Sequence, residues 1–406
     1  MNRTAKAVSF RLLPFAILGL LSSFVMAQQP ASPPIIVVVD DVHDANSMSA
    51  FIDKSPYTSL TPLPGSPFTT NSVAQSGPYA TSGIAQAPGT GGTRCTYVAD
   101  GLGPNGDGKF SDIAVFRGTT SETHLVENFF SGEGLSGINY GIGLSINGKY
   151  LYANYSGSVI IEVLQIDPST CKLIDTGNGV DASGPGFGIA VSITAKAGNC
   201  LFATYGDGSV GSYKIGDGTI TRVQQKFTGG SRMFGGTPAM AVVTKDGYVL
   251  FDDALTNGSL YDAYKIGSGC QMTNNRVSGP YFTTIRNSNT FVLAPDGTTI
   301  YTIGQASGTI ATHHYSGSGL VTETSCEDVA MNGFGTNFVF PGTGATPTAN
   351  GAGNGLFVAE SSNGSGMSHV GAFVYFNGCL INGGQFQTDD HTINAQYLVT
   401  LAQPSQ

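Results

Sequence analysis

The chain has 406 residues and a formal net charge of −9 at pH 7, and only 11% of its residues are charged. An acidic surface repels phosphate backbones, which argues against a nucleic-acid partner. Glycine supplies 57 residues, while Val, Ile, Tyr and Phe recur at regular intervals, a composition typical of an all-β chain with many tight turns and not of disorder.

The first 27 residues have the three parts of a secretory signal peptide. Basic residues precede an apolar stretch from Leu12 to Met26, and small residues at Val25-Met26-Ala27 form a cleavage site. The stretch is short, is broken by Pro14 and has no basic stop after it, which argues against a membrane anchor. We therefore predict a secreted or periplasmic monomer with no membrane span after cleavage, organised as a signal peptide over 1–27, a linker over 28–34 and one domain over 35–406.

A short pattern recurs about every fifty residues along the rest of the chain. In each unit an aromatic residue inside an apolar run is followed by Gly, then Ser or Thr, then a β-branched residue or Leu. The glycines of the four clearest copies, spaced by 51, 50 and 50 residues, are Gly157, Gly208, Gly258 and Gly308. A fixed period of this size with four short strands per unit predicts propeller blades. A β-helix is the alternative fold, but its rungs are shorter and lack the hairpin turns of this sequence.

The predicted units follow one another in chain order. An irregular unit runs from Tyr79 to Phe130. The clearest unit, 141–173, has an inner strand, an Asn147-Gly148 hairpin turn and three further strands. The same order recurs from four later positions, namely Phe187, Pro238, Phe291 and Asn337.

The two ends of the chain supply a seventh unit. Three strands without an inner strand are predicted near the N-terminus, over 35–39, 47–52 and 60–68, and an inner strand with nothing after it is predicted over 397–401. Pairing of the two ends closes the ring and removes the open sheet edges. The sequence thus predicts an all-β, seven-bladed β-propeller closed by its N- and C-terminal strands.

Six cysteines lie at positions 95, 171, 200, 270, 326 and 379, and no two of them form a Cys-x-x-Cys motif for zinc or thioredoxin-like chemistry. In an exported chain an even number predicts disulfides. Cys171, Cys270 and Cys379 open outermost strands, and Cys95 and Cys200 open second strands. Because these turns share one face, we expect bridges between neighbouring units, with the pairing left open.

Three segments resemble the lactonase-type seven-bladed propellers with YVTN-type repeats, a family related to phosphogluconolactonases and muconate cycloisomerases. They are residues 60–68 (LTPLPGSPF), 149–154 (KYLYAN) and 294–297 (APDG). The resemblance covers 35–406 and rests on motifs that build blades. It implies hydrolysis of a sugar lactone or a related small carbohydrate. Active members of the family have His and Arg at the starts of inner strands, and the matching positions here, such as Asn139-Tyr140 and Asn289-Thr290, hold no His.

In a propeller, the loops that join each fourth strand to the next inner strand gather at the mouth of the central channel. Few ionisable residues fall in these predicted loops, and the catalytic candidates among them are Arg232, Arg286, Asp389 and His391, with Asp181 and Asp390 completing the set. A carboxylate or imidazole would activate water, and a guanidinium would stabilise the oxyanion on the lactone carbonyl. The alternative is a non-catalytic propeller that binds a glycan or a protein at the cell surface.

The segment 100–112 resembles the calcium loops of integrin-type propeller repeats. Alternating oxygen ligands around a Gly turn suit a hard cation, so the candidate calcium ligands are Asp100, Asn105, Asp107 and Asp112. Gly103 stands where the first Asp of that motif is expected, and a plain hairpin turn is the alternative. No other cofactor is expected.

Two adjacent histidines, His313 and His314, lie in the middle of a predicted strand of the fifth unit. Alternation along a strand turns the two rings to opposite faces. They therefore cannot bind one metal ion together, and we expect a structural or surface role for both.

Overall fold

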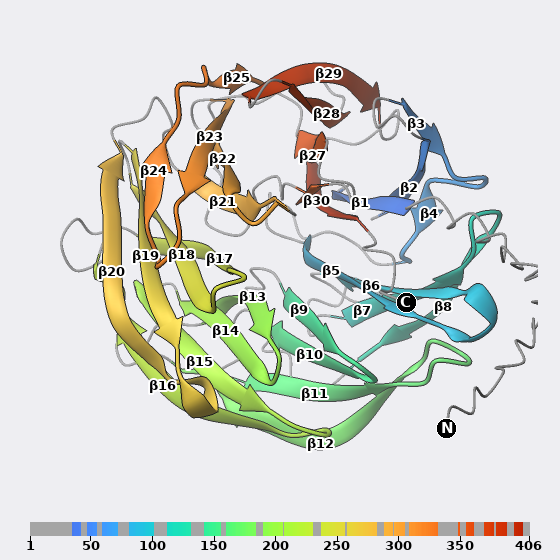
Figure 1. Ribbon diagram of the computed structural model, residues 1–406. Helices are drawn as coiled ribbons and strands as arrows, with labels where there is room; N and C mark the ends of the chain where they lie inside the picture. Colours follow the sequence, from blue (N-terminus) through green and yellow to red (C-terminus); the bar gives the residue numbers. More distant parts are fainter. Residues whose placement is uncertain are drawn as a thin grey trace, which may run out of the picture. The chain divides into compact units, whose positions relative to one another are not determined.

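Almost all of the described backbone is β-strand, gathered in seven small antiparallel sheets (Figure 1). All of the described residues belong to one compact unit, 33–406, and the predicted signal peptide and linker lie outside them. No helix in this part of the chain is long and apolar enough to cross a membrane. The computed structural model describes residues 35–41, 47–54, 59–71, 81–100, 112–130, 142–155, 160–183, 190–205, 207–229, 237–255, 258–281, 288–294, 296–304, 308–331, 348–349, 355–360, 369–376, 379–387 and 394–400.

We call the sheets blades 1 to 7 and give the strands of each from the inside outward. Blade 1 contains β5 (Thr81–Pro88), β6 (Arg94–Asp100), β7 (Asp112–Gly118) and β8 (Thr123–Phe129). Blade 2 contains β9 (Ile142–Asn147), β10 (Tyr150–Tyr155), β11 (Ile160–Ile166) and β12 (Leu173–Asp181). Blade 3 contains β13 (Ala190–Ala197), β14 (Cys200–Tyr205), β15 (Ser209–Ile215) and β16 (Ile220–Phe227). Blade 4 contains β17 (Thr237–Val243), β18 (Tyr248–Leu255), β19 (Gly258–Ile266) and β20 (Met272–Tyr281).

The last three blades have shorter or interrupted strands. Blade 5 contains β21 (Ser288–Leu293), β22 (Thr299–Gly304), β23 (Thr309–Tyr315) and an outer strand in two pieces, β24 (Val321–Glu323) and β25 (Val329–Ala330). Blade 6 contains β26 (Thr348–Ala349), β27 (Gly355–Glu360), β28 (His369–Phe376) and β29 (Cys379–Gln387). Blade 7 contains β30 (Asn394–Thr400), β1 (Ile35–Asp41), β2 (Ser47–Lys54) and another divided outer strand, β3 (Ser59–Pro62) and β4 (Phe68–Thr69).

The chain ends close the ring, as the sequence predicts. The inner strands contact one another in the cyclic order β5, β9, β13, β17, β21, β26, β30 and back to β5. β30 pairs antiparallel with β1, with Val37 opposite Val399. The seven-bladed propeller is therefore confirmed. Asn337, the predicted start of the sixth repeat, lies outside the described residues, and the described inner strand of that blade is β26.

The core lies between the blades, where the repeated aromatic residues are buried. The Tyr97 hydroxyl of blade 1 donates to the Cys171 carbonyl of blade 2 at 3.0 Å, and the Tyr152 hydroxyl of blade 2 donates to the Gly216 carbonyl of blade 3 at 3.2 Å. Each ring thus buries a large apolar surface while its hydroxyl finds a partner in the next blade. Phe251 breaks the repeat, because it packs back against blade 3 with Phe202.

Three disulfides join neighbouring blades in pairs, which confirms the expected bridges between units. They are Cys95–Cys171 between blades 1 and 2, Cys200–Cys270 between blades 3 and 4, and Cys326–Cys379 between blades 5 and 6. All six cysteines are therefore paired.

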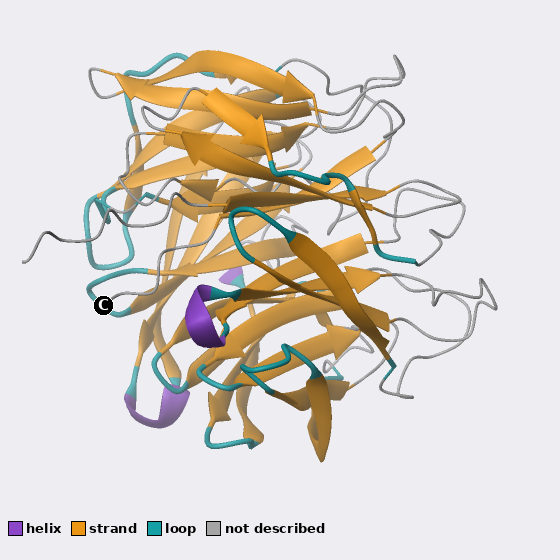
Figure 2. Ribbon diagram, turned by 90° about the vertical axis from the view of Figure 1, so that its right-hand side faces the viewer, coloured by secondary structure: helices purple, strands orange, loops and turns teal. Residues whose placement is uncertain are grey.

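The two ends of the sheets differ in the connections that they carry. At one end lie the hairpin turns from first to second and from third to fourth strand, together with the short 3-10 helices η1 (Thr90–Gly92) and η2 (Ser268–Cys270), which Figure 2 shows in purple. Cys171 and Cys270 lie in these turns. At the other end, which we call the mouth face, each outer strand leads to the inner strand of the next blade. The strand order therefore brings all connections of that type to one face.

Candidate functional site

The four catalytic candidates fall in connections of the mouth face. Arg232 lies between β16 and β17, Arg286 between β20 and β21, and Asp389 and His391 between β29 and β30. All four lie outside the described residues. The structure describes the strand ends on either side of them, and these ends belong to the mouth face.

Asp181, another ionisable residue of the predicted mouth loops, is the last residue of β12. Its carboxylate accepts a hydrogen bond from the Ser183 backbone N–H at 2.7 Å and lies 3.5 Å from the Arg222 guanidinium. The bonds from Ser183, aided by the charge of Arg222, lower the pKa of the Asp181 carboxyl. A lowered pKa weakens a carboxylate as a base, so Asp181 is better suited to fixing the chain than to activating water.

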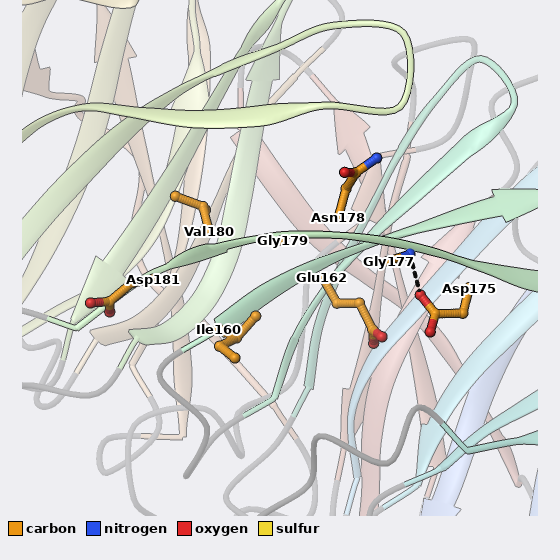
Figure 3. Close-up of a pocket in the computed structure, with 8 residues that line it drawn as sticks. All are labelled: Ile160, Glu162, Asp175, Gly177, Asn178, Gly179, Val180 and Asp181. Carbon is orange, nitrogen blue, oxygen red and sulfur yellow. Dashed lines mark hydrogen bonds between the residues drawn. The ribbon is translucent and has the colours of Figure 1, made fainter.

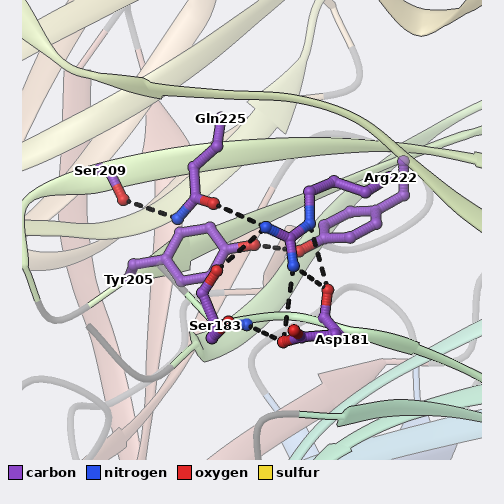
Figure 4. A network of polar contacts seen from close by, with 7 residues as sticks. Asp181, Ser183, Tyr205, Ser209, Arg222 and Gln225 are labelled. Atoms are coloured by element: carbon purple, nitrogen blue, oxygen red, sulfur yellow. Dashed lines mark hydrogen bonds and ion pairs between the residues drawn. The ribbon is translucent and has the colours of Figure 1, made fainter. Parts of the chain in front are cut away.

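Arg222 of β16 is the centre of a polar network that joins blade 3 to the end of β12 (Figure 4). Its guanidinium donates to the Asp181 carbonyl at 3.1 Å and to the Ser183 carbonyl at 3.1 Å. It also donates to Gln225 Oε1 at 3.3 Å, and Gln225 Nε2 donates to Ser209 Oγ at 3.1 Å. The network therefore holds the first residues after β12, where the connection to β13 begins.

Beside this network, in which Figure 4 labels Tyr205, the buried hydroxyls of Tyr205 and Tyr213 are hydrogen-bonded to each other. Burial raises the pKa of both phenols. Both hydroxyls therefore stay protonated at neutral pH, and the pair is a structural contact between β14 and β15.

The sequence placed Asp181 in a mouth loop, but Arg222 and its contacts were not predicted from it. Arg222 lies within an outer strand, opposite Tyr213 in the strand pairing, and not in a loop. Two of its contacts are to main-chain carbonyls about forty positions away, and carbonyls are present at every residue, so no spacing of side chains reports these two contacts.

The predicted calcium loop is described only at its two ends. Asp100 and Asp112 are directly opposite each other where β6 and β7 pair, while Asn105 and Asp107 lie outside the described residues. The buried Asp112 carboxylate accepts a hydrogen bond at 2.7 Å from the side-chain amide of Asn128. No group of three or more His, Cys, Asp or Glu side chains in the described part of the chain is placed to hold a metal ion. The calcium site thus stays a prediction.

A depression of about 310 Å³ lies on the outer edge of blade 2 (Figure 3). It is lined by residues of β11 and β12, namely Ile160, Glu162, Asp175, Gly177, Asn178, Gly179, Val180 and Asp181. All of its charged side chains are carboxylates, so it offers no cationic side chain to a developing oxyanion.

The two histidines of β23 point to opposite faces, as alternation predicts. His313 is buried with its ring 5.6 Å from that of Tyr261, whereas His314 is exposed. Burial lowers the pKa of His313 to about 4, which keeps the ring neutral at neutral pH.

No protein-family model matches the sequence, and a search of curated proteins finds no relative. Solved structures do match. A protein from Lactobacillus plantarum aligns with a TM-score of 0.64 and 14% identity over 91% of this chain and 99% of that one. A "putative 6-phosphogluconolactonase" from Bacteroides uniformis aligns at 0.61 with 11% identity over 91% and 100%. The periplasmic gluconolactonase of Pseudomonas aeruginosa aligns at 0.59 with 15% identity over 92% and 100%. These likenesses show that the chain has the fold of the lactonase-type propellers that its sequence resembles.

Proposed function

We propose that the chain is an exported lactonase-like propeller that hydrolyses a sugar lactone, or a related small carbohydrate, at the mouth of its channel. The observation that carries the proposal is the strand order. The connections that contain Arg232, Arg286, Asp389 and His391 all leave outer strands that end at the mouth face. Charged residues make up only 11% of the chain and few of them fall in these connections, so these four side chains are the main candidates there for a base and a cation.

The proposed chemistry needs one base and one cation. His391 or Asp389 would take a proton from water as its oxygen attacks the lactone carbonyl. The guanidinium of Arg232 or Arg286 would stabilise the tetrahedral oxyanion. Collapse of that intermediate breaks the ring C–O bond, and the departing alkoxide takes the proton back from the base. The product is the open-chain hydroxy acid.

Two further findings support the proposal. One solved structure of the same fold is named a periplasmic gluconolactonase, although at 15% identity it supports the activity only by analogy. The three disulfides suit an oxidising compartment, in agreement with the predicted signal peptide.

A second candidate function is a non-catalytic propeller that binds a glycan or a protein. It is favoured by the described charges at the mouth face. Asp181 and Arg222 are bonded to each other and to the main chain, so these two charges hold the start of a connection.

The test is hydrolysis of a panel of sugar δ- and γ-lactones by the purified, oxidised protein, with calcium and with a chelator. Turnover of at least one lactone above the spontaneous rate supports the enzyme. Binding of an immobilised glycan or protein without turnover of any lactone would instead favour the second function. A requirement for calcium would support the predicted metal loop.

A further inference from the structure

The charges of this chain are unevenly distributed among the blades. Seven acidic residues and no Lys or Arg follow Arg286, so the part of the sequence that forms blades 5 and 6 and β30 carries only negative charge. Lysines gather instead in blades 2 to 4, which Figure 1 draws in green to yellow.

Within blades 2 to 4 the lysines lie at one end of the sheets. We call the end that carries the hairpin turns the turn face. In these three blades the turns, with the two strand residues on either side of each, contain six lysines, three aspartates, no Arg and no Glu. The lysines are Lys149, Lys172, Lys196, Lys214, Lys245 and Lys265. An acidic protein thus carries a basic patch on the face away from the mouth, and such a patch attracts anions.

A hollow of about 350 Å³ lies in this patch, between blades 2 and 3. Three hairpin turns line it, through residues 147–150, Asn199 and residues 216–217. Lys149 Nζ lies 3.6 Å from Asp217 Oδ1 across the two blades, and Lys196 Nζ donates to Asn147 Oδ1 at 3.0 Å. Two ammonium groups and one carboxylate therefore surround the hollow, which leaves positive charge in excess.

The frame of the hollow is held by contacts within the protein. The Tyr152 hydroxyl of blade 2 donates at 3.2 Å to the carbonyl of Gly216 in the turn of blade 3. Gly218 packs against the Tyr150 ring so closely that a Cβ there would lie 3.1 Å from the ring atoms. Asn199 directly precedes a cysteine that is disulfide-bonded to blade 4. The lining is therefore in place before any ligand arrives, which lowers the entropic cost of binding.

The side chains around the hollow suit a sugar that bears a carboxylate. A lysine ammonium forms a charge-assisted hydrogen bond with a carboxylate, and the amides of Asn147 and Asn199 can both donate to and accept from hydroxyl groups. A surface that enters a lipid bilayer presents apolar side chains. Among the described residues that line the hollow, none is Leu, Ile, Val, Met or Phe. The lining thus favours an acidic sugar over a lipid surface.

We propose that this hollow binds a uronate unit of an acidic glycan. Lys149 and Lys196 bind the carboxylate, the two asparagines bind ring hydroxyls, and the remaining lysines of the turn face attract the rest of the anionic chain. The site lies at the end of the sheets away from the mouth. It therefore goes beyond the proposed lactone hydrolysis and does not depend on it.

The test is calorimetric titration of the whole oxidised protein with a short oligogalacturonate and with its methyl ester, which keeps the sugar rings and removes the charge. The parent should bind the acid at least about tenfold more tightly than the ester, and added salt should weaken binding of the acid. Equal affinity for acid and ester, or binding of neither, would overturn the proposal.

Substitutions locate the binding. Lys149→Gln combined with Lys196→Gln should weaken binding of the acid about tenfold. Asp217→Asn removes a carboxylate that repels the ligand, so it should tighten binding about threefold. The matched control is Lys172→Gln, the same change on the same face but outside the lining, where Lys172 lies 3.6 Å from Glu127 of blade 1. It should change the affinity by less than about twofold.

Two results of these substitutions would overturn the proposal. Parent affinity in the double variant would place the binding elsewhere, and an equal loss in Lys172→Gln would show a diffuse charge effect without a site. All four side chains are exposed, so each variant should melt at the parent temperature.

A lipid surface and the lactonase proposal are tested separately. Binding of the parent to phosphatidylglycerol vesicles, without binding of the oligogalacturonate, would identify a lipid surface as the partner and overturn the proposal. The lysine substitutions should leave any lactone hydrolysis at the mouth unchanged. Failure to hydrolyse lactones would therefore remove the proposed function and leave the calorimetric result standing.

Discussion

The buried imidazole of His313 should make this protein lose stability as the pH falls below neutrality. The pKa of His313 is about 4 in the folded protein because burial disfavours the charged ring, against about 6.5 in an unfolded chain. Between these values the unfolded chain binds a proton that the folded chain does not. The titration of His313 therefore leaves the free energy of unfolding unchanged well above pH 6.5 and lowers it as the pH drops from 6.5 to 4. Below pH 4 this titration lowers it no further.

The size of the effect follows from the two pKa values. Each pKa unit corresponds to about 1.4 kcal/mol, so the difference between folded and unfolded His313 amounts to about 3 kcal/mol at pH 4. His313→Gln removes the titrating group and should remove that loss. The comparison between parent and variant isolates His313, because the carboxylates titrate alike in both.

The assay is urea unfolding of the oxidised protein at several pH values from 7.5 to 4, followed by tyrosine fluorescence, since the chain has 17 tyrosines and no tryptophan. His314→Gln is the matched control, because this neighbour is exposed on the other side of the same strand. The reasoning is refuted if the parent and His313→Gln lose the same unfolding free energy over this range.

Three further predictions concern one disulfide, the pairing of the two chain ends that closes the ring, and the proposed catalytic base. Replacing Cys200 and Cys270 by serine should cost about 4 kcal/mol of unfolding free energy, since the bridge spans 70 residues; an unchanged urea midpoint would contradict this. Deleting 396–406 removes most of β30 and leaves the edge of β1 unpaired, so the truncated protein should melt lower and self-associate in size-exclusion chromatography; a monomer with the parent melting temperature would rule out the closure. If lactones are hydrolysed, His391→Ala should abolish the acidic limb of the pH–rate profile as well as lower the rate; a profile of unchanged shape would exclude His391 as the base.

The fold could be predicted because its signals are local and repeated. Hairpin turns such as Asn147-Gly148 and the fifty-residue period mark strands wherever they occur. The seventh blade could be predicted as well, because each end of the chain lacks the strands that the other supplies. The disulfide pairing could not be chosen from the sequence, since it depends on which turns of neighbouring blades meet.

The site could be predicted less completely, for a physical reason. Candidates such as Arg286 were found by their place in loops, and the structure describes only the strands that carry those loops. Arg222 was missed because it binds main-chain carbonyls of another blade, and such contacts leave no recognisable spacing between side chains. The aromatic repeat also does not tell which neighbouring blade each ring contacts. Phe202 and Phe251 occupy equivalent positions in successive units, but Phe202 packs towards blade 4 and Phe251 packs back towards blade 3.

The most direct test of the proposed function is the kcat/KM of the parent and of Arg286→Ala on the best lactone of the panel. Loss of one oxyanion partner costs roughly 2–4 kcal/mol of transition-state stabilisation, so kcat/KM should fall by about 30- to 1,000-fold while the melting temperature stays that of the parent. Lactone hydrolysis by the parent at no more than the spontaneous rate, or full activity in Arg286→Ala, would contradict a lactonase site at the mouth face.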